Sequence, residues 1–134
     1  MNRYELAAIA ALLACWSCVP QMDRARIRAQ EYAAIQRIST IHAAEAQYYS
    51  MNNKYAASLA ELASADLIPK KLAEGKDGGY IFKVTLQPNG YAVTAMPEVF
   101  GSTGNRSFYS DQTLVTRHSE TQEPAGPNSP EIPH

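Results

Sequence analysis

One uninterrupted stretch, residues 23–49, constrains the fold of this chain more than any other part of it. Its apolar residues recur at helical spacing, at Ile27, Ala34, Ile35, Ile38, Ile41, Ala44 and Tyr48. That spacing places them on one face of an α-helix, and no Gly or Pro interrupts the pattern. At about 1.5 Å per residue, such a helix is roughly 40 Å long. It needs a partner that covers its apolar face.

The later part of the chain predicts a small antiparallel sheet. Residues 80–86 alternate in polarity, and Pro88-Asn89-Gly90 joins them to residues 91–96 through a tight turn, because Asn-Gly favours positive φ. Residues 107–110 and 114–117 predict a second hairpin. We therefore expect an α+β fold in which a long N-terminal helix packs on a small antiparallel sheet of about four strands.

Local signals indicate how the helix and the sheet are joined. Asn52 or Asn53 is expected to end the long helix, because Asn tolerates the left-handed conformation that closes a helix. Ser58 and Glu61 have the spacing of a capping box. This pair predicts a short helix over residues 59–65.

The chain begins with a short apolar segment. Residues 6–19 are uncharged and largely apolar. A bilayer span needs about 20 such residues, whereas runs of about 10–14 are typical of signal-peptide cores or buried helices. We interpret residues 1–22 as an export or anchor segment, which leaves a cleaved signal, a lipoprotein signal and a membrane helix as alternatives.

Both cysteines of the chain, Cys15 and Cys18, lie in this segment. The sequence Leu12-Leu13-Ala14-Cys15 resembles the lipobox of bacterial lipoproteins, in which a Leu and then a small residue precede the Cys that receives diacylglycerol. On this interpretation Cys15 is the lipid attachment site and becomes the mature N-terminus. The alternative is that both cysteines are small apolar residues of a membrane helix.

Several segments together resemble the type IV pilin and pseudopilin family. In that family the long helix kinks at a proline and continues as an amphipathic second half with arginines at its start. The segment Val19-Pro20, followed by residues 24–27, resembles this point. Residues 34–49 resemble the end of that helix, residues 55–82 its connection to the first strand, and residues 108–117 the closing hairpin. The likeness covers about residues 19–117, in the family's order.

This resemblance implies a non-enzymatic subunit of a pilus or of a type II secretion apparatus in the bacterial cell envelope. The helix would lie in the membrane or in a filament core, with the head exported and with membrane lipid and other pilin-like subunits as partners. Glu5 matches the family's helix glutamate, which implies a charge partner for the next chain's N-terminus, and Pro20 matches the kink. Family members are cut after a Gly, and no Gly precedes Gly75 here. The alternative is a lipoprotein tethered through Cys15 that uses a pilin-like head as a binding module.

Composition and motifs give no indication of chemistry. A net charge of −1 and a pI near 6.3 lack the basic face typical of nucleic-acid binding. The sequence has no Gly-rich phosphate loop, nucleophile elbow or H-E-x-x-H motif, so we expect no catalytic residue, cofactor or small-molecule substrate.

His42 and Glu45 have a spacing found in some metal sites, but two ligands are weak evidence, and we favour a polar patch at the edge of the helix–sheet contact.

The last segment differs from the rest in composition. Residues 119–134 contain four prolines and few apolar residues, which predicts a disordered tail. The expected organisation is an anchor segment over residues 1–22, a pilin-like domain over residues 23–118 and the tail over residues 119–134.

Overall fold

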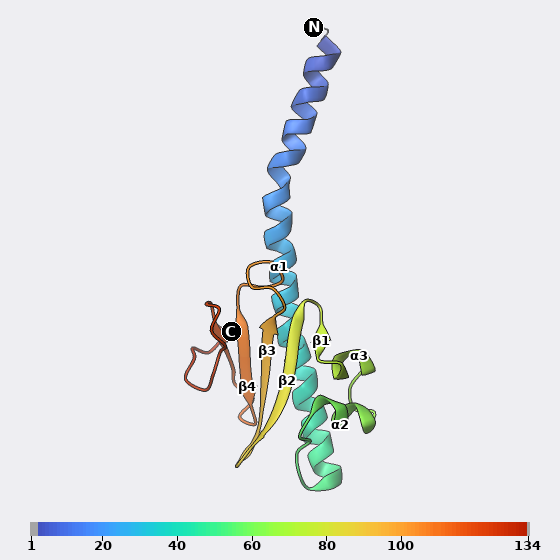
Figure 1. The fold of residues 1–134 in the computed structure, drawn as a ribbon, viewed down its shortest axis with the longest axis vertical. Coiled ribbons are helices and arrows are strands. Elements are labelled where there is room, and N and C mark those ends of the chain that lie inside the picture. The colour runs from blue at the N-terminus through green and yellow to red at the C-terminus, as the bar shows by residue number, and fades with distance from the viewer. Residues whose placement is uncertain (1–2, 134) are drawn as a thin grey trace.

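The longest element, α1, spans Arg3–Asn52 (Figure 1). The computed structural model describes the backbone of residues 3–133 and the side chains of residues 23–133. The later elements are α2 (Leu59–Ser64), α3 (Lys70–Ala73), β1 (Lys76–Asp77), β2 (Tyr80–Gln87), β3 (Gly90–Pro97), β4 (Ser107–Asp111) and β5 (Thr116–Ser119). In this described part the strands form one antiparallel sheet in the order β1-β2-β3-β4-β5. The α+β fold agrees with the prediction, but the sheet has five strands and not four.

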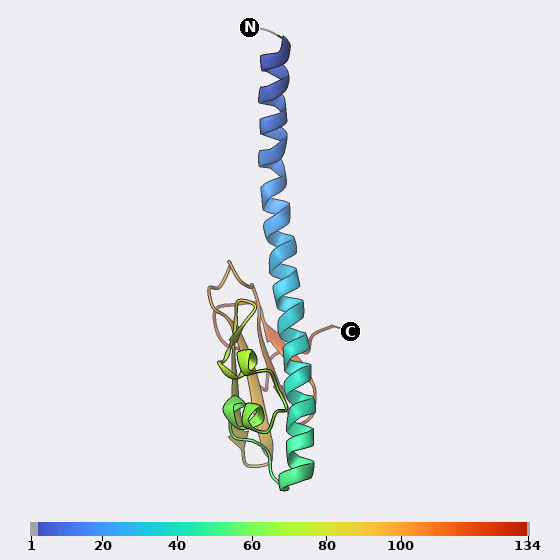
Figure 2. The same ribbon diagram turned by 90° about the vertical axis from the view of Figure 1, so that its right-hand side faces the viewer.

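The C-terminal half of α1 lies along one face of the sheet (Figure 2). Ala34, Ile38, Ile41 and Ala44 are buried there, which confirms the centre of the apolar face predicted over residues 23–49. They form one core cluster with inward side chains of the strands, including Tyr80, Phe82, Val84, Tyr91, Val93 and Phe108. Burial of each large side chain contributes about 1.5–3 kcal/mol, so this contact is the main source of stability of the head.

The helix ends where the sequence predicts. Asn53 has a φ of 58°, the left-handed conformation that closes α1 without a glycine. The Ser58 hydroxyl accepts a hydrogen bond from the Glu61 N–H at 3.2 Å, as expected for the N-cap of α2. The Glu61 carboxylate accepts from the N–H of Ala57, one residue before the cap. The capping box is therefore present with its second bond shifted by one position.

The first predicted hairpin is confirmed, whereas the second is confirmed only in part. The pairing of β2 with β3 closes at Gln87 and Gly90, as the Asn-Gly turn predicts. The prediction that a strand begins at Leu114 is wrong, because β5 begins at Thr116. The Asp111 carboxylate accepts the N–H of Thr113 at 3.0 Å, and Leu114 has a φ of 67°. This side-chain-capped turn lengthens the loop by two residues.

One of the five strands, β1, was not predicted from the sequence. It contains two residues, which is too short for an alternating pattern to reveal. It pairs with the start of β2, and the Arg37 Nε of α1 donates to the Asp77 carboxylate at 2.7 Å. That hydrogen bond holds the pKa of Asp77 below its ordinary value. A bond from α1 thus fixes the edge strand.

The proline-rich segment after β5 makes ordered contacts, in contrast to the predicted disorder. The His118 N–H donates to the Pro130 carbonyl at 2.9 Å, and the Ile132 N–H donates to the Thr116 carbonyl at 3.0 Å. Ala125 is buried in a second small cluster. The segment forms hydrogen bonds with backbone groups on the free edge of β5. The composition of the segment alone does not reveal these contacts. His134 lies outside the described residues.

The N-terminal part of α1 projects beyond the sheet (Figures 1 and 2). The helix continues through Pro20, the position expected to mark a kink, without ending there. Within residues 3–133, no helix has a stretch that is both long enough and apolar enough to cross a membrane. The side chains of Glu5, Cys15 and Pro20 lie outside the part of the chain whose side chains the structure describes.

Candidate functional site

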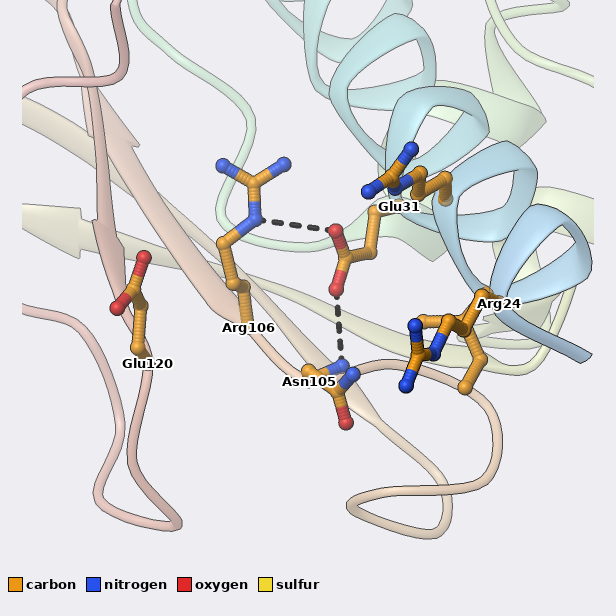
Figure 3. Close-up of a pocket in the computed structure, with 7 residues that line it drawn as sticks. Arg24, Glu31, Asn105, Arg106 and Glu120 are labelled. Atoms are coloured by element: carbon orange, nitrogen blue, oxygen red, sulfur yellow. Dashed lines mark hydrogen bonds and ion pairs between the residues drawn. The ribbon is translucent and has the colours of Figure 1, made fainter. Parts of the chain in front are cut away.

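A hollow of about 500 Å³ lies beside the stretch of α1 that contains residues 24–31 (Figure 3). We call it the neck pocket. Four lining residues come from α1, two from the loop before β4 and one from the segment after β5: Arg24, Ile27, Arg28, Glu31, Asn105, Arg106 and Glu120. Three parts of the chain that are distant in sequence therefore meet at this point.

Glu31 joins the helix to the loop before β4. Its side chain is 8% exposed, and its carboxylate accepts from the Asn105 N–H at 2.9 Å and from Arg106 Nε at 3.0 Å (Figure 3). Hydrogen bonds to an ionised group are shorter and stronger than neutral ones. Both bonds therefore fix the position of residues 105 and 106 against α1.

The sheet holds Arg106 from the opposite side. The hydroxyl of the buried Tyr80 donates to the Arg106 carbonyl at 2.6 Å. Burial raises the pKa of Tyr80 far above its ordinary value, so the hydroxyl stays protonated and remains a donor. The Arg106 guanidinium also lies over the Phe108 ring, 5.2 Å from its centroid. Arg106 is thus positioned before any ligand arrives.

Two further arginines of the neck pocket are exposed. Arg24 and Arg28 are four residues apart and lie on the same side of α1. Neither forms an ion pair or a side-chain hydrogen bond with another residue whose side chain is described, whereas Arg26 pairs with Asp23 at 3.7 Å. Among the residues whose side chains are described, these two guanidinium groups have no partner, and guanidinium donors suit a phosphate or a carboxylate.

A second polar group lies inside the head, around His42. The Ser110 hydroxyl donates to the Val115 carbonyl at 2.9 Å, so its oxygen accepts from His42 Nε2, at 2.7 Å. His42 Nδ1 is then the acceptor for the Tyr91 hydroxyl. This arrangement uses the neutral ring, and burial lowers the pKa of His42 accordingly. His42 acts here as a bridge between α1 and two strands.

Glu45, three residues further on, has a different role. It is fully buried, and its Oε2 accepts from the Ala56 N–H at 2.9 Å. Its Oε1 has no hydrogen-bond partner among the described residues. Burial raises the pKa of Glu45 to about 7. The carboxyl therefore fastens the connection after α1 to the core.

The residues singled out from the sequence do not converge on one site. Glu5, Cys15 and Pro20 belong to the projecting part of α1. His42 and Glu45, which were weighed as metal ligands, bond to different partners, and in the part of the chain that the structure describes no cluster of three or more His, Cys, Asp or Glu side chains could hold a metal ion.

The sequence prediction missed the neck pocket. Arg24 and Arg28 lie five and nine residues after the end of the apolar segment, and that position is a signal in the sequence. Glu31, Ile38 and Glu45 are spaced by seven residues, so two acidic side chains share the buried face of α1. Acidic residues at such positions indicate buried partners. The partners themselves, 75 residues away for Arg106, have no signal in the sequence.

Comparison of the chain with protein-family models, with curated proteins and with solved structures finds no match. Its function is therefore inferred from its residues and their geometry.

Proposed function

We propose that the chain is a non-enzymatic, pilin- or pseudopilin-like subunit of a filament or secretion apparatus in the bacterial envelope. One observation supports this most strongly. The helix α1 has 50 residues, and among its residues 23–52, whose side chains the structure describes, the first buried position is Glu31. The part of α1 before the neck pocket extends beyond the end of the sheet (Figure 2). A projecting helix with an apolar run over residues 6–19 needs a cover that the head does not supply.

The cover in this proposal is a set of identical helices from neighbouring copies, within a membrane or a filament core. Residues 6–19 are rich in alanine, and small residues let helices approach closely. Glu5 would pair with the N-terminus of the next chain. The head would then face outward, on the exported side of the membrane.

The second candidate is an envelope lipoprotein, and a specific sequence observation favours it. Leu12-Leu13-Ala14-Cys15 has the spacing of a lipobox, while no Gly precedes Gly75 to serve as a prepilin cleavage site. In this case Cys15 carries the lipid, residues 1–14 are removed, and the head binds another envelope component through its exposed face or loops.

The mass of the mature N-terminus distinguishes the two candidates. The chain is purified from membranes and from material sheared off the cell surface, and intact mass is measured for both. The filament proposal predicts sheared material in which Cys15 is unmodified and residue 5 is retained. A diacylated Cys15 at the N-terminus of all recovered chains contradicts it and supports the lipoprotein. Cys15→Ser and Cys18→Ser are the matched variants, because only the first removes the lipid attachment site.

A further inference from the structure

The neck pocket carries an excess of positive charge. Arg106 neutralises the buried Glu31, which leaves Arg24 and Arg28 facing only Glu120 among the lining residues. The excess is therefore one positive charge, which matches a singly charged anion such as a phosphodiester. In Figure 3 the side chain of Arg24 reaches toward Asn105, so donors from α1 and from the loop before β4 lie close together.

The position of the pocket along α1 suggests the source of this anion. Arg24 is five residues and Arg28 nine residues beyond Val19, the end of the apolar segment, which corresponds to about 8 Å and about 14 Å along a helix. The headgroup layer on each side of a bilayer is about 5–8 Å thick. Arginine side chains can also extend back toward the membrane. If residues 6–19 are embedded, the guanidinium groups lie at the depth of the lipid phosphates.

The lipoprotein alternative leads to a similar placement. With a lipid on Cys15, Arg24 lies nine residues from the anchored residue, about 14 Å along the helix. Both forms of membrane attachment thus bring the pocket to the membrane surface.

We propose that the neck pocket binds the phosphate of an anionic phospholipid headgroup and so fixes the orientation of the head on the membrane. The inference rests on the membrane attachment in the proposed function, but not on polymerisation. The Arg24 and Arg28 guanidinium groups donate to the phosphate oxygens, and Arg106 is held in place by Glu31 and Phe108. Glu120 accepts from hydroxyl groups of a glycerol headgroup, and the one excess positive charge of the pocket favours the anionic phosphatidylglycerol over the zwitterionic phosphatidylcholine.

The test is an NMR titration of the full-length chain in nonionic maltoside micelles, which contain no phosphate. Short-chain phosphatidylglycerol, short-chain phosphatidylcholine and inorganic phosphate are added separately, and the signals of the Asn105 N–H and the arginine Nε–H groups are followed. We expect saturable shifts with phosphatidylglycerol and none with phosphatidylcholine. Inorganic phosphate should bind at least about tenfold more weakly, because it gains nothing from the micelle surface. Equal binding of inorganic phosphate identifies a free-anion site and overturns the lipid proposal.

Three single variants distinguish binding of the headgroup in the pocket from nonspecific attraction between the arginines and anionic lipid. Arg24→Ala and Arg28→Ala should each weaken phosphatidylglycerol binding about tenfold, because each removes a hydrogen bond between two charged groups. Arg26→Ala removes the same charge from the same turn, but Arg26 does not line the pocket, so its effect should stay below about twofold. All three arginines are exposed, so the variants should fold. Equal effects of all three, or no saturable shift in the parent chain, contradict the proposal.

The outcome is independent of the N-terminal mass measurement. A chain recovered neither from membranes nor from sheared surface material refutes the proposed function, while the micelle titration still reports whether the pocket binds the headgroup. A failed titration leaves the filament and lipoprotein candidates as they stand.

Discussion

Glu31 of α1 and Arg106 before β4 form an ion pair with a distance of 3.0 Å between Nε and Oε2, and the carboxylate has only 8% of its side chain exposed. The pair fastens the loop before β4 to the helix at the point where the helix leaves the core. Removing one partner of a buried pair leaves an uncompensated charge.

Substitution of Glu31 by Ala should therefore lower the free energy of unfolding by about 2–4 kcal/mol, toward the low end of that range because water reaches part of Arg106. Urea unfolding monitored by circular dichroism measures this change. Asp23→Ala is the matched control, because Asp23 pairs with Arg26 at the surface and its loss should cost less than about 1 kcal/mol. Equal effects of the two substitutions would show that Glu31 is not buried in solution.

The buried Glu45 should make stability decrease as the pH rises. Its pKa is about 7 in the folded chain, above the ordinary value of 4.5, so the folded state binds more protons than the unfolded state between those values. The contribution of Glu45 to the free energy of unfolding is fully present below pH 4.5 and is lost as the pH rises through 7. The total loss is about 2–4 kcal/mol. Glu45→Gln should remove this loss.

The measurement is the free energy of unfolding of the parent chain and of Glu45→Gln from pH 4.5 to 8. The difference between the two isolates Glu45 from His42, whose lowered pKa gives a dependence of the opposite sign below pH 6.5. Parallel pH profiles for the two chains would contradict a raised pKa of Glu45.

The bridge through His42 should depend on Ser110. Replacement of Ser110 by Ala leaves His42 Nε2–H without its acceptor in a buried place, so we expect a loss of about 1–3 kcal/mol. Ser39→Ala on the exposed side of α1 is the control and should change stability by less than about 0.5 kcal/mol. Nitrogen chemical shifts of the His42 ring at neutral pH should indicate a proton on Nε2, and a proton on Nδ1 would refute the assigned bridge.

The proline-rich segment should protect the edge of β5. Deletion of residues 129–134 removes the Pro130 carbonyl that accepts from the His118 N–H. Hydrogen exchange at the His118 amide should then accelerate at least about tenfold, while the Val93 amide in the centre of the sheet stays protected. Unchanged exchange at His118 would mean that the segment does not cover β5 in solution.

Periodic and local patterns in the sequence predicted the parts of the fold that such patterns can specify. The spacing of Ile38 and Ile41 identified the buried face of α1, and Asn53 and Ser58 identified a helix end and a helix start. These features depend on neighbours within a few residues. Their prediction therefore needed no knowledge of the tertiary structure.

Features that depend on distant partners were not predictable in this way. The strand β1 is held by Arg37, and the neck pocket depends on a pair of residues 75 positions apart. The last segment is ordered through a few backbone bonds and one buried alanine, Ala125, although its composition is typical of disorder. The candidate site lies in this second group, because tertiary contacts create it.

Photo-crosslinking of the projecting helix in cells tests whether copies pack through it. A photoreactive phenylalanine at Ala8 or Ala11, inside residues 6–19, is compared with the same residue at the exposed Gln47 of the head. Both cysteines are retained, so lipid attachment is not disturbed. If residues 6–19 are buried between subunits, light should give a ladder of homo-oligomers from positions 8 and 11 and none from position 47. Monomers alone at all three positions, with the chain bound to the membrane, would contradict a filament subunit.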